Sequence, residues 1–175
     1  MSQIKHFKLL SEYNELMNQR LYEAVSKLPD EKIKENRGAF FKSLLGTLNH
    51  ILVGDIIWLS RFATDPSSKN ALSYFTEIEK PRSLNSVIHN EFNELKMERE
   101  KIDKLIINWI DFLTEENLYS KIGYKNMNGD NFNKDFSSLI NHLFLHQVHH
   151  RGQATTLLSQ FGVDFGETDL IEIIK

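Results

Sequence analysis

Four long segments of this chain repeat apolar residues at the three- and four-residue spacing of an amphipathic helix. Ser83 suits the N-cap of the third segment, either Asp135 or Ser137 suits that of the fourth, and Gly162 follows the last apolar position. The spacing therefore predicts an all-α fold with four helices, at about residues 2–28, 41–62, 83–113 and 135–162.

Two stretches interrupt the helical pattern. Between residues 115 and 134 the period disappears around Asn128-Gly129, which predicts a small β-hairpin or extended flap between the third and fourth helices. We expect this flap to lie against the helices, where it could narrow the entrance to a site. Residues 63–81 form a long loop that either walls a pocket or is packed down by Tyr74 and Phe75. The charged faces of residues 91–104 are predicted to be solvated.

Length and charge narrow the class of protein. A chain of 175 residues, 41% of them hydrophobic, predicts one domain over residues 1–175. The 21 basic and 24 acidic residues are interspersed without a basic block, which argues against nucleic-acid binding. The chain has no cysteine, which excludes thiolate ligands and a cysteine nucleophile and fits a reducing cytoplasmic location. No signal-peptide stretch opens the chain, and polar residues interrupt its most apolar segment, so we expect a soluble protein without membrane attachment.

Three of the seven histidines fall within five residues of the fourth helix. His146 and His150 share one face, at a spacing that lets two imidazoles reach one metal ion. A zincin protease is not expected, because Gln147 stands where that motif has its glutamate. On spacing alone, a metal site and a pair of hydrogen-bonded core histidines are equally good interpretations. His142 extends the same face. His149 points about 100° away from His150, so we expect it to lie at the surface or to contact a metal-ligating residue, and not to bind the metal itself.

The second helix carries His50, which on its own indicates a hydrogen-bonded interior histidine more than a ligand. This helix is apolar around much of its circumference, which predicts packing on two sides, in a subunit interface or deep in a bundle. His6 and His89 are predicted to be exposed and without a functional role.

Residues 48–61 (LNHILVGDIIWLSR), followed far downstream by residues 146–153 (HQVHHRGQ), resemble the DinB family, also called DinB/YfiT-like proteins. The resemblance covers nearly the whole chain. It implies a four-helix bundle of up-down-down-up topology, usually a homodimer, that holds a divalent metal on three histidines. By position these ligands are His50, His146 and His150. Three imidazoles leave room for water or substrate on the metal and suit zinc or nickel.

Neighbouring polar residues could orient these imidazoles. Asn49, Asp55 and Gln153 are within reach, and Asp55 needs a partner because it lies in an otherwise apolar helix. Asp55 could equally pair with Arg61 or Arg151.

The resemblance also implies an activity on a small-molecule substrate. We expect a metal-dependent transferase that adds a low-molecular-weight thiol to an electrophile, in detoxification or a stress response; the cofactor would bring the sulfur that the chain lacks. The alternatives are a metal-dependent hydrolase, although no neighbouring glutamate offers a general base, and a non-catalytic metal-binding stress protein.

Overall fold

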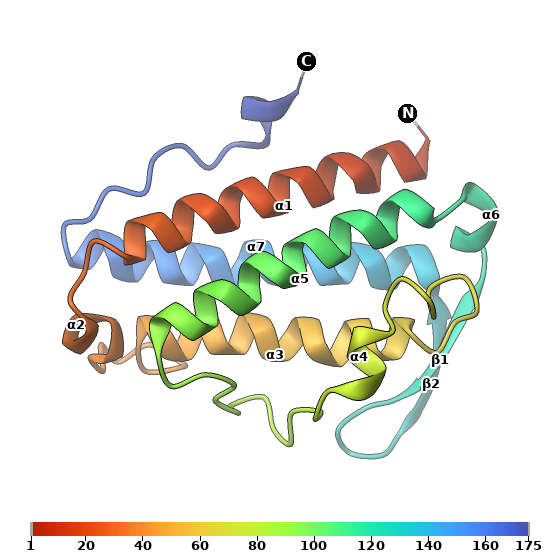
Figure 1. Cartoon of the computed structure of the whole chain (residues 1–175), viewed down its shortest axis with the longest axis horizontal. Helices are drawn as coiled ribbons and strands as arrows, with labels where there is room; N and C mark the ends of the chain where they lie inside the picture. The colour runs from red at the N-terminus through yellow and green to blue at the C-terminus, as the bar shows by residue number, and fades with distance from the viewer. Residues whose placement is uncertain (1, 175) are drawn as a thin grey trace.

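The computed structural model describes residues 2–174, and a bundle of four long helices makes up most of it. Figure 1 shows α1 and α7 running in one direction and α3 and α5 in the other, which is the predicted up-down-down-up arrangement. The long helices are α1 (Gln3–Val25), α3 (Leu44–Phe62), α5 (Phe92–Phe112) and α7 (Phe136–Gln160).

Short elements connect the long helices. The predicted hairpin is confirmed: its two strands pair antiparallel, with Tyr124 opposite Phe132, and a turn through Gly129 joins them. The helical turns of the connecting segments were not predicted, because single turns leave no periodic pattern. These elements are α2 (Asp30–Lys34), α4 (Tyr74–Glu77), α6 (Glu115–Leu118), β1 (Lys121–Lys125), β2 (Asn131–Asp135) and a final 3₁₀ turn, η1 (Leu170–Ile173).

The long helices pack in defined pairs. In the bundle, α1 lies against α5 and α7, and α3 lies against α7. At one end of the core the ring of Phe62 stacks on Trp109 and Phe136 packs against both at a tilt. The indole of Trp109 donates to Ser68 Oγ at 2.9 Å. Phe75 is fully buried, so the 63–81 loop is packed down against this core. Among the described residues, no helix combines the length and apolar character needed to cross a membrane.

The third long helix begins nine residues later than predicted, at Phe92 instead of residue 83. Ser83 is not its N-cap; the Ser83 amide donates to Ser86 Oγ instead. The preceding stretch is a loop that α3 holds from the side, because Asn49 Oδ1 accepts from the amides of Ile88 and His89. Those amides are therefore occupied by a tertiary contact and do not enter a helix.

The second long helix begins at Leu44, capped by Ser43 Oγ, which accepts from the Gly46 amide at 3.1 Å. Phe41, predicted to be its first residue, lies in a tight turn folded back on the helix. A Cβ at Gly46 would lie only 2.0 Å from the Phe41 carbonyl oxygen, so only glycine allows this approach. The turn brings the Phe41 ring over the side of α3.

The apolar circumference of α3 is covered within the chain. Of its 19 residues, 15 are buried by α7 and by the segments that flank α3 in the bundle. The helix therefore does not need a second subunit to bury it. The homodimer remains a prediction that rests on the family resemblance.

Candidate metal centre

Three histidines from two helices converge at the junction of α3 and α7. His50 Nε2 lies 3.1 Å from His150 Nε2 and 3.1 Å from His146 Nε2. One ring nitrogen from each of the three residues lies within 4.8 Å of the others, which is a grouping that could hold a metal ion. The pairing of His146 with His150 follows from helical spacing, whereas His50 is brought in by the antiparallel packing of α3 on α7.

Hydrogen bonds fix the tautomers of two of these imidazoles. His50 Nδ1 lies 2.9 Å from the Leu84 carbonyl oxygen, which can only accept, so Nδ1 carries the proton. His150 Nδ1 likewise donates to Gln153 Oε1 at 2.8 Å, while Gln153 Nε2 donates to His149 Nε2. In both rings the Nε2 lone pair is left free and points toward the centre of the cluster.

The arrangement of these lone pairs fits a bound cation. Two unprotonated nitrogens 3.1 Å apart cannot hydrogen-bond to each other and repel until a positive charge lies between them. Ligands at about 2.0–2.1 Å from a tetrahedral zinc ion are roughly 3.3 Å apart, close to the separation found here. The donor set therefore suits a divalent ion such as zinc or nickel.

All three imidazoles are held in the neutral form that metal ligation requires. Burial, together with the neighbouring imidazoles of His150 and His50, lowers the pKa of His146 to about 3. Burial also lowers the pKa of His50 and of His150, although the Leu84 carbonyl and Gln153 partly offset this by stabilising a protonated ring. No proton has to leave these rings at neutral pH before an ion binds.

The imidazole of His146 occupies a space that exists because residue 54 is glycine. A Cβ at Gly54 would lie 2.4 Å from His146 Cε1 and 2.9 Å from His146 Nδ1. His146 Nδ1 is buried and has no partner among the described residues. The ring is thus positioned by close packing against α3 at Gly54 more than by a hydrogen bond.

Asn49 acts on the centre through the loop before α5. Its side-chain oxygen accepts from two loop amides, and its amide nitrogen donates to the carbonyls of Leu45 and His89 at 3.0 Å each. The same loop supplies the Leu84 carbonyl that holds His50. Asn49 therefore orients His50 indirectly, by holding the loop in place.

Asp55 does not hydrogen-bond to an imidazole: of the two alternatives predicted from the sequence, pairing with an arginine is the one found, although the arginine is Arg99 and not Arg61 or Arg151. Its carboxylate accepts from Arg99, and both carboxylate oxygens accept from Gln147 Nε2 at 3.0 Å. The guanidinium of Arg61 lies elsewhere, over the rings of Trp58 and Tyr124, 4.5 Å from each ring centroid. Asp55 supports the centre only by fixing Gln147, the neighbour of His146.

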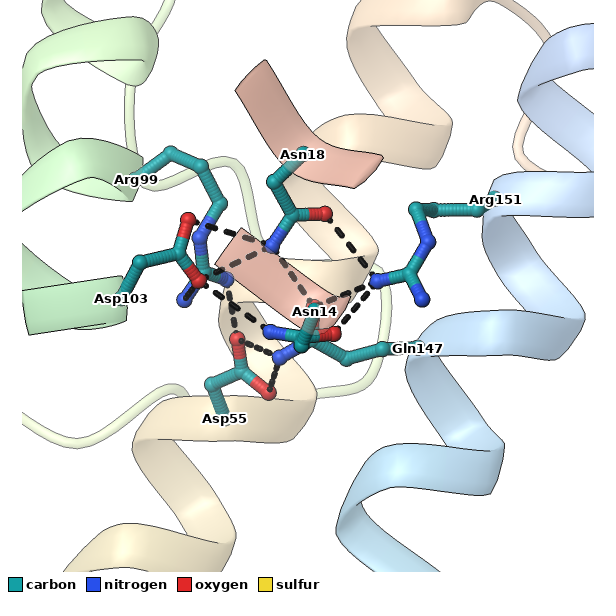
Figure 2. A network of polar contacts seen from close by, with 7 residues as sticks. All are labelled: Asn14, Asn18, Asp55, Arg99, Asp103, Gln147 and Arg151. Atoms are coloured by element: carbon teal, nitrogen blue, oxygen red, sulfur yellow. Dashed lines mark hydrogen bonds and ion pairs between the residues drawn. The ribbon is translucent and has the colours of Figure 1, made fainter. Parts of the chain in front are cut away.

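Asp55 belongs to a buried polar network to which all four long helices contribute (Figure 2). Arg99 pairs with Asp55 and, at 2.9 Å, with Asp103, and Asp103 accepts from Asn18. The charged face of α5 was predicted to be solvated, but Arg99 and Asp103 are 2% and 3% exposed. The sequence does not distinguish a solvated i,i+4 charge pair from a buried one. The only sequence feature that indicated a buried cation was the carboxylate of Asp55, in an otherwise apolar helix. The members are Asn14, Asn18, Asp55, Arg99, Asp103, Gln147 and Arg151.

The ionised groups of this network stabilise one another. Burial raises the pKa of Asp103 to about 6, against the opposing effect of Arg99. Burial alone would lower the pKa of Arg99, but the charges of Asp103 and Asp55 outweigh it and raise that pKa above its ordinary value. Removing one partner of such a pair costs about 3–5 kcal/mol.

A cavity of about 380 Å³ lies beside the N-terminal end of α3, and Phe41 separates it from His50. The ring of Phe41 lines it and stacks on His50, with ring centroids 3.8 Å apart and an interplanar angle of 16°. The lining also includes Asn49 and the exposed side chains of Asn85 and Val87. The hairpin contributes no residue to this cavity; it packs over the other end of α3, where Tyr124 contacts Trp58.

The other histidines lie outside the cluster. His142 packs edge-on against Trp58 at 4.9 Å, one turn from His146, and His149 is exposed beside Gln153. His6 is partly exposed on α1, and the imidazole of His89 lies 3.5 Å from Glu94 at the start of α5.

Comparison with known proteins shows the family of this chain. Among curated proteins, the chain is similar to Protein DinB of Bacillus subtilis (strain 168), with 26% identity over 164 residues, 93% of this chain and 90% of that relative. No solved structure matches the chain at a significant level. The family model described as DinB family matches residues 1–174, including both helices that carry the three histidines. The chain therefore belongs to the DinB family.

Proposed function

We propose that this protein is a divalent-metal-dependent transferase that joins a low-molecular-weight thiol to a small electrophile. The observation that carries the proposal is the convergence of three neutral imidazoles, of His50, His146 and His150, with two free lone pairs facing each other. Three protein ligands leave a coordination position for a substrate atom, which distinguishes catalytic from structural sites.

The surroundings of the site favour a thiol over water as the nucleophile. Among the described residues, no carboxylate hydrogen-bonds to any of the three imidazoles and no acidic side chain lines the neighbouring cavity, so no carboxylate is placed there as a general base for water. A divalent ion lowers the pKa of a thiol bound to it and so supplies a thiolate at neutral pH. The sulfur would then bond to the electrophilic carbon while the leaving group departs with its electron pair and the thiol proton passes to solvent.

The cavity beside Phe41 supports a small-molecule substrate. Its lining combines the aromatic surface of Phe41 and Phe40 with side-chain amides, including Asn36 and Asn85, and with the cation of Lys34. An apolar wall with a few polar groups is typical of small-molecule sites. Because Phe41 both lines the cavity and covers His50, a change in its rotamer would open the cavity toward the metal ligands.

Activity can be tested with defined thiols. Protein loaded with Zn²⁺ or Ni²⁺ is incubated with bacillithiol, mycothiol or glutathione and a chloronitrobenzene electrophile, and conjugation is followed by absorbance. We expect acceleration over the metal-free protein with at least one thiol, and loss of that acceleration in His150→Ala. Equal rates with and without metal for every thiol would refute the transferase.

Metal binding is tested separately from activity. We expect His50→Ala, His146→Ala and His150→Ala each to lose most bound metal, measured by elemental analysis after dialysis. His6→Ala, on α1 and outside the histidine cluster, is the matched control and should keep full occupancy. Full occupancy in all three ligand variants would overturn the site assignment.

A further inference from the structure

Arg151 is a buried arginine that contacts no carboxylate among the described residues. It is 6% exposed, and one terminal nitrogen, Nη1, donates to the amide oxygens of Asn14, Asn18 and Gln147. Both buried carboxylates of the network instead contact Arg99. A buried cation without a direct counter-ion raises the free energy of the folded state, so binding an anion at this guanidinium would be favourable.

The second terminal nitrogen of Arg151, Nη2, is buried and has no hydrogen-bond partner in the part of the chain that the structure describes. Figure 2 shows it directed away from the six other residues of the network. Burial lowers the pKa of Arg151 to about 10, so the group still carries its charge at neutral pH. Leaving a charged donor of this kind unpaired in the interior costs stability, which pairing with an anion would restore.

A cavity of about 180 Å³ adjoins Arg151 between α1, α7 and the C-terminal tail. Its apolar walls include Met17, Val148 and Phe165, and within residues 2–174 no acidic side chain lines it. It is smaller than an ordinary drug-sized site and matches the volume of about six water molecules. Cation and apolar wall together select a small anion with a hydrocarbon body.

The C-terminal tail forms the roof of this cavity. Tyr13 Oη donates to the Thr168 carbonyl at 2.5 Å, and Arg20 Nη1 donates to the Glu167 carbonyl at 2.6 Å. The ring of Tyr13 also lies over the Arg151 guanidinium, 5.7 Å from Cζ to the ring centroid. Release of these few contacts would open the cavity without disturbing the bundle.

We propose that this cavity binds a small monocarboxylate with an apolar body, its carboxylate paired with the Arg151 guanidinium and its hydrocarbon part against Met17, Val148 and Phe165. Val148, Gly152 and Thr155 place the cavity on the side of α7 opposite to His146 and His150. The site is therefore distinct from the metal centre and independent of the proposed transferase activity. Arg20, the other cation in the lining, is already paired with the Glu167 carbonyl and with Glu172, so Arg151 is the cation left to bind an anion. Inorganic phosphate fits less well than a monocarboxylate, because the apolar walls offer no partner to its remaining oxygens.

Hexanoate is the probe, titrated against the full chain and followed by two-dimensional NMR at constant ionic strength, with inorganic phosphate and chloride as comparison anions. The titration is repeated after chelation, because a carboxylate can also bind a metal ion. We expect saturable shifts at Val148 and Thr155 that persist in the metal-free protein.

Gly152 provides matched variants for this test. It is exposed and lines the cavity, and a Cβ built there meets no atom within 4 Å, so α7 tolerates a larger side chain at the edge of the cavity. We expect Gly152→Leu to weaken hexanoate binding by at least about tenfold, because its side chain fills the space. Gly152→Ala, with the same backbone change, should keep most of the affinity.

Arg151→Gln removes the charge and should weaken binding by about tenfold or more. If this variant does not fold, Gly152→Leu decides. The proposal is overturned if the wild type shows no saturable binding, if Gly152→Leu binds as tightly as Gly152→Ala, if the shifts vanish on chelation, or if phosphate binds as tightly as hexanoate.

Discussion

Replacing Gly54 with alanine should remove metal binding while leaving the helix bundle folded. The new Cβ would lie 2.4 Å from His146 Cε1 and 2.9 Å from His146 Nδ1. Non-bonded carbon atoms prefer about 3.5–4.0 Å, so the imidazole must move by roughly 1 Å or more. The helix backbone at residue 54 is held on both sides by buried neighbours, so the ring and not the helix gives way.

The expected magnitudes follow from two opposing effects. Alanine in a helix interior is more favourable than glycine by about 0.8–1.0 kcal/mol. Overpacking a tight contact costs about 1–3 kcal/mol. The net loss in the free energy of unfolding is therefore only about 0–2 kcal/mol. Metal ligation tolerates deviations of about 0.2 Å, so displacement of His146 should lower metal affinity at least about 100-fold.

Gly152→Ala is the matched control, because this residue also lies inside a helix but its new Cβ would meet nothing within 4 Å. It should gain up to about 1 kcal/mol of stability and keep its metal affinity. Urea unfolding in the presence of chelator measures the free energies, and titration against a chromophoric chelator measures the affinity. If Gly54→Ala binds metal as tightly as Gly152→Ala, the contact does not position His146.

Three further predictions follow from the same structure. Asn49→Ala frees the loop that carries the Leu84 carbonyl and should weaken metal affinity about 10–100-fold; unchanged affinity in calorimetric titration would contradict that role. Burial raises the pKa of Asp103 from 3.8 to about 6, so the folded state holds this proton more tightly. Its contribution to stability is complete below about pH 4 and is lost as the pH rises through 6. The wild type should therefore gain stability relative to Asp103→Asn as pH falls from 7 to 4 in urea unfolding of metal-free protein, and a difference independent of pH would refute this. Metal at 100 times its Kd should raise the free energy of unfolding by about 2.7 kcal/mol, seen as a higher melting temperature that chelator reverses, and His150→Ala should show no such response.

The sequence predicted the helices and the hairpin, whose formation depends on residues close together in the chain. Helical spacing located the four long helices, and Asn128-Gly129 located the hairpin, because periodic burial and turn chemistry are written in adjacent residues. His146 and His150 could be paired from their spacing. The approach of His50 could not, because it depends on the packing of α3 on α7, and only the family resemblance suggested it.

The loop before α5 shows why a helical pattern can mislead. Leu84 and Val87 fit the apolar period, yet they are 51% and 56% exposed. Asn49 holds the amides of Ile88 and His89, and His50 holds the Leu84 carbonyl, so hydrogen bonds from α3 outweigh a weak helix preference. The mistaken stretch is the one that orients a histidine of the candidate site.

The interleaved residues of α7 explain how the bundle holds the candidate site in register. His146 and His150 point toward α3, while Gln147 and Arg151, one residue further along, point into the polar network. The two histidines and the pair Gln147 and Arg151 lie on neighbouring faces of the same helix. Any rotation of α7 about its axis therefore moves both pairs together. Rotating the histidines away from His50 would also strip Gln147 from Asp55 and Arg151 from its amide partners, deep in the core. The network therefore resists displacement of the histidines, although Gln147 and Arg151 form no hydrogen bond with His50. The imidazoles are held close together before a metal ion binds, so the ion does not have to bring them together.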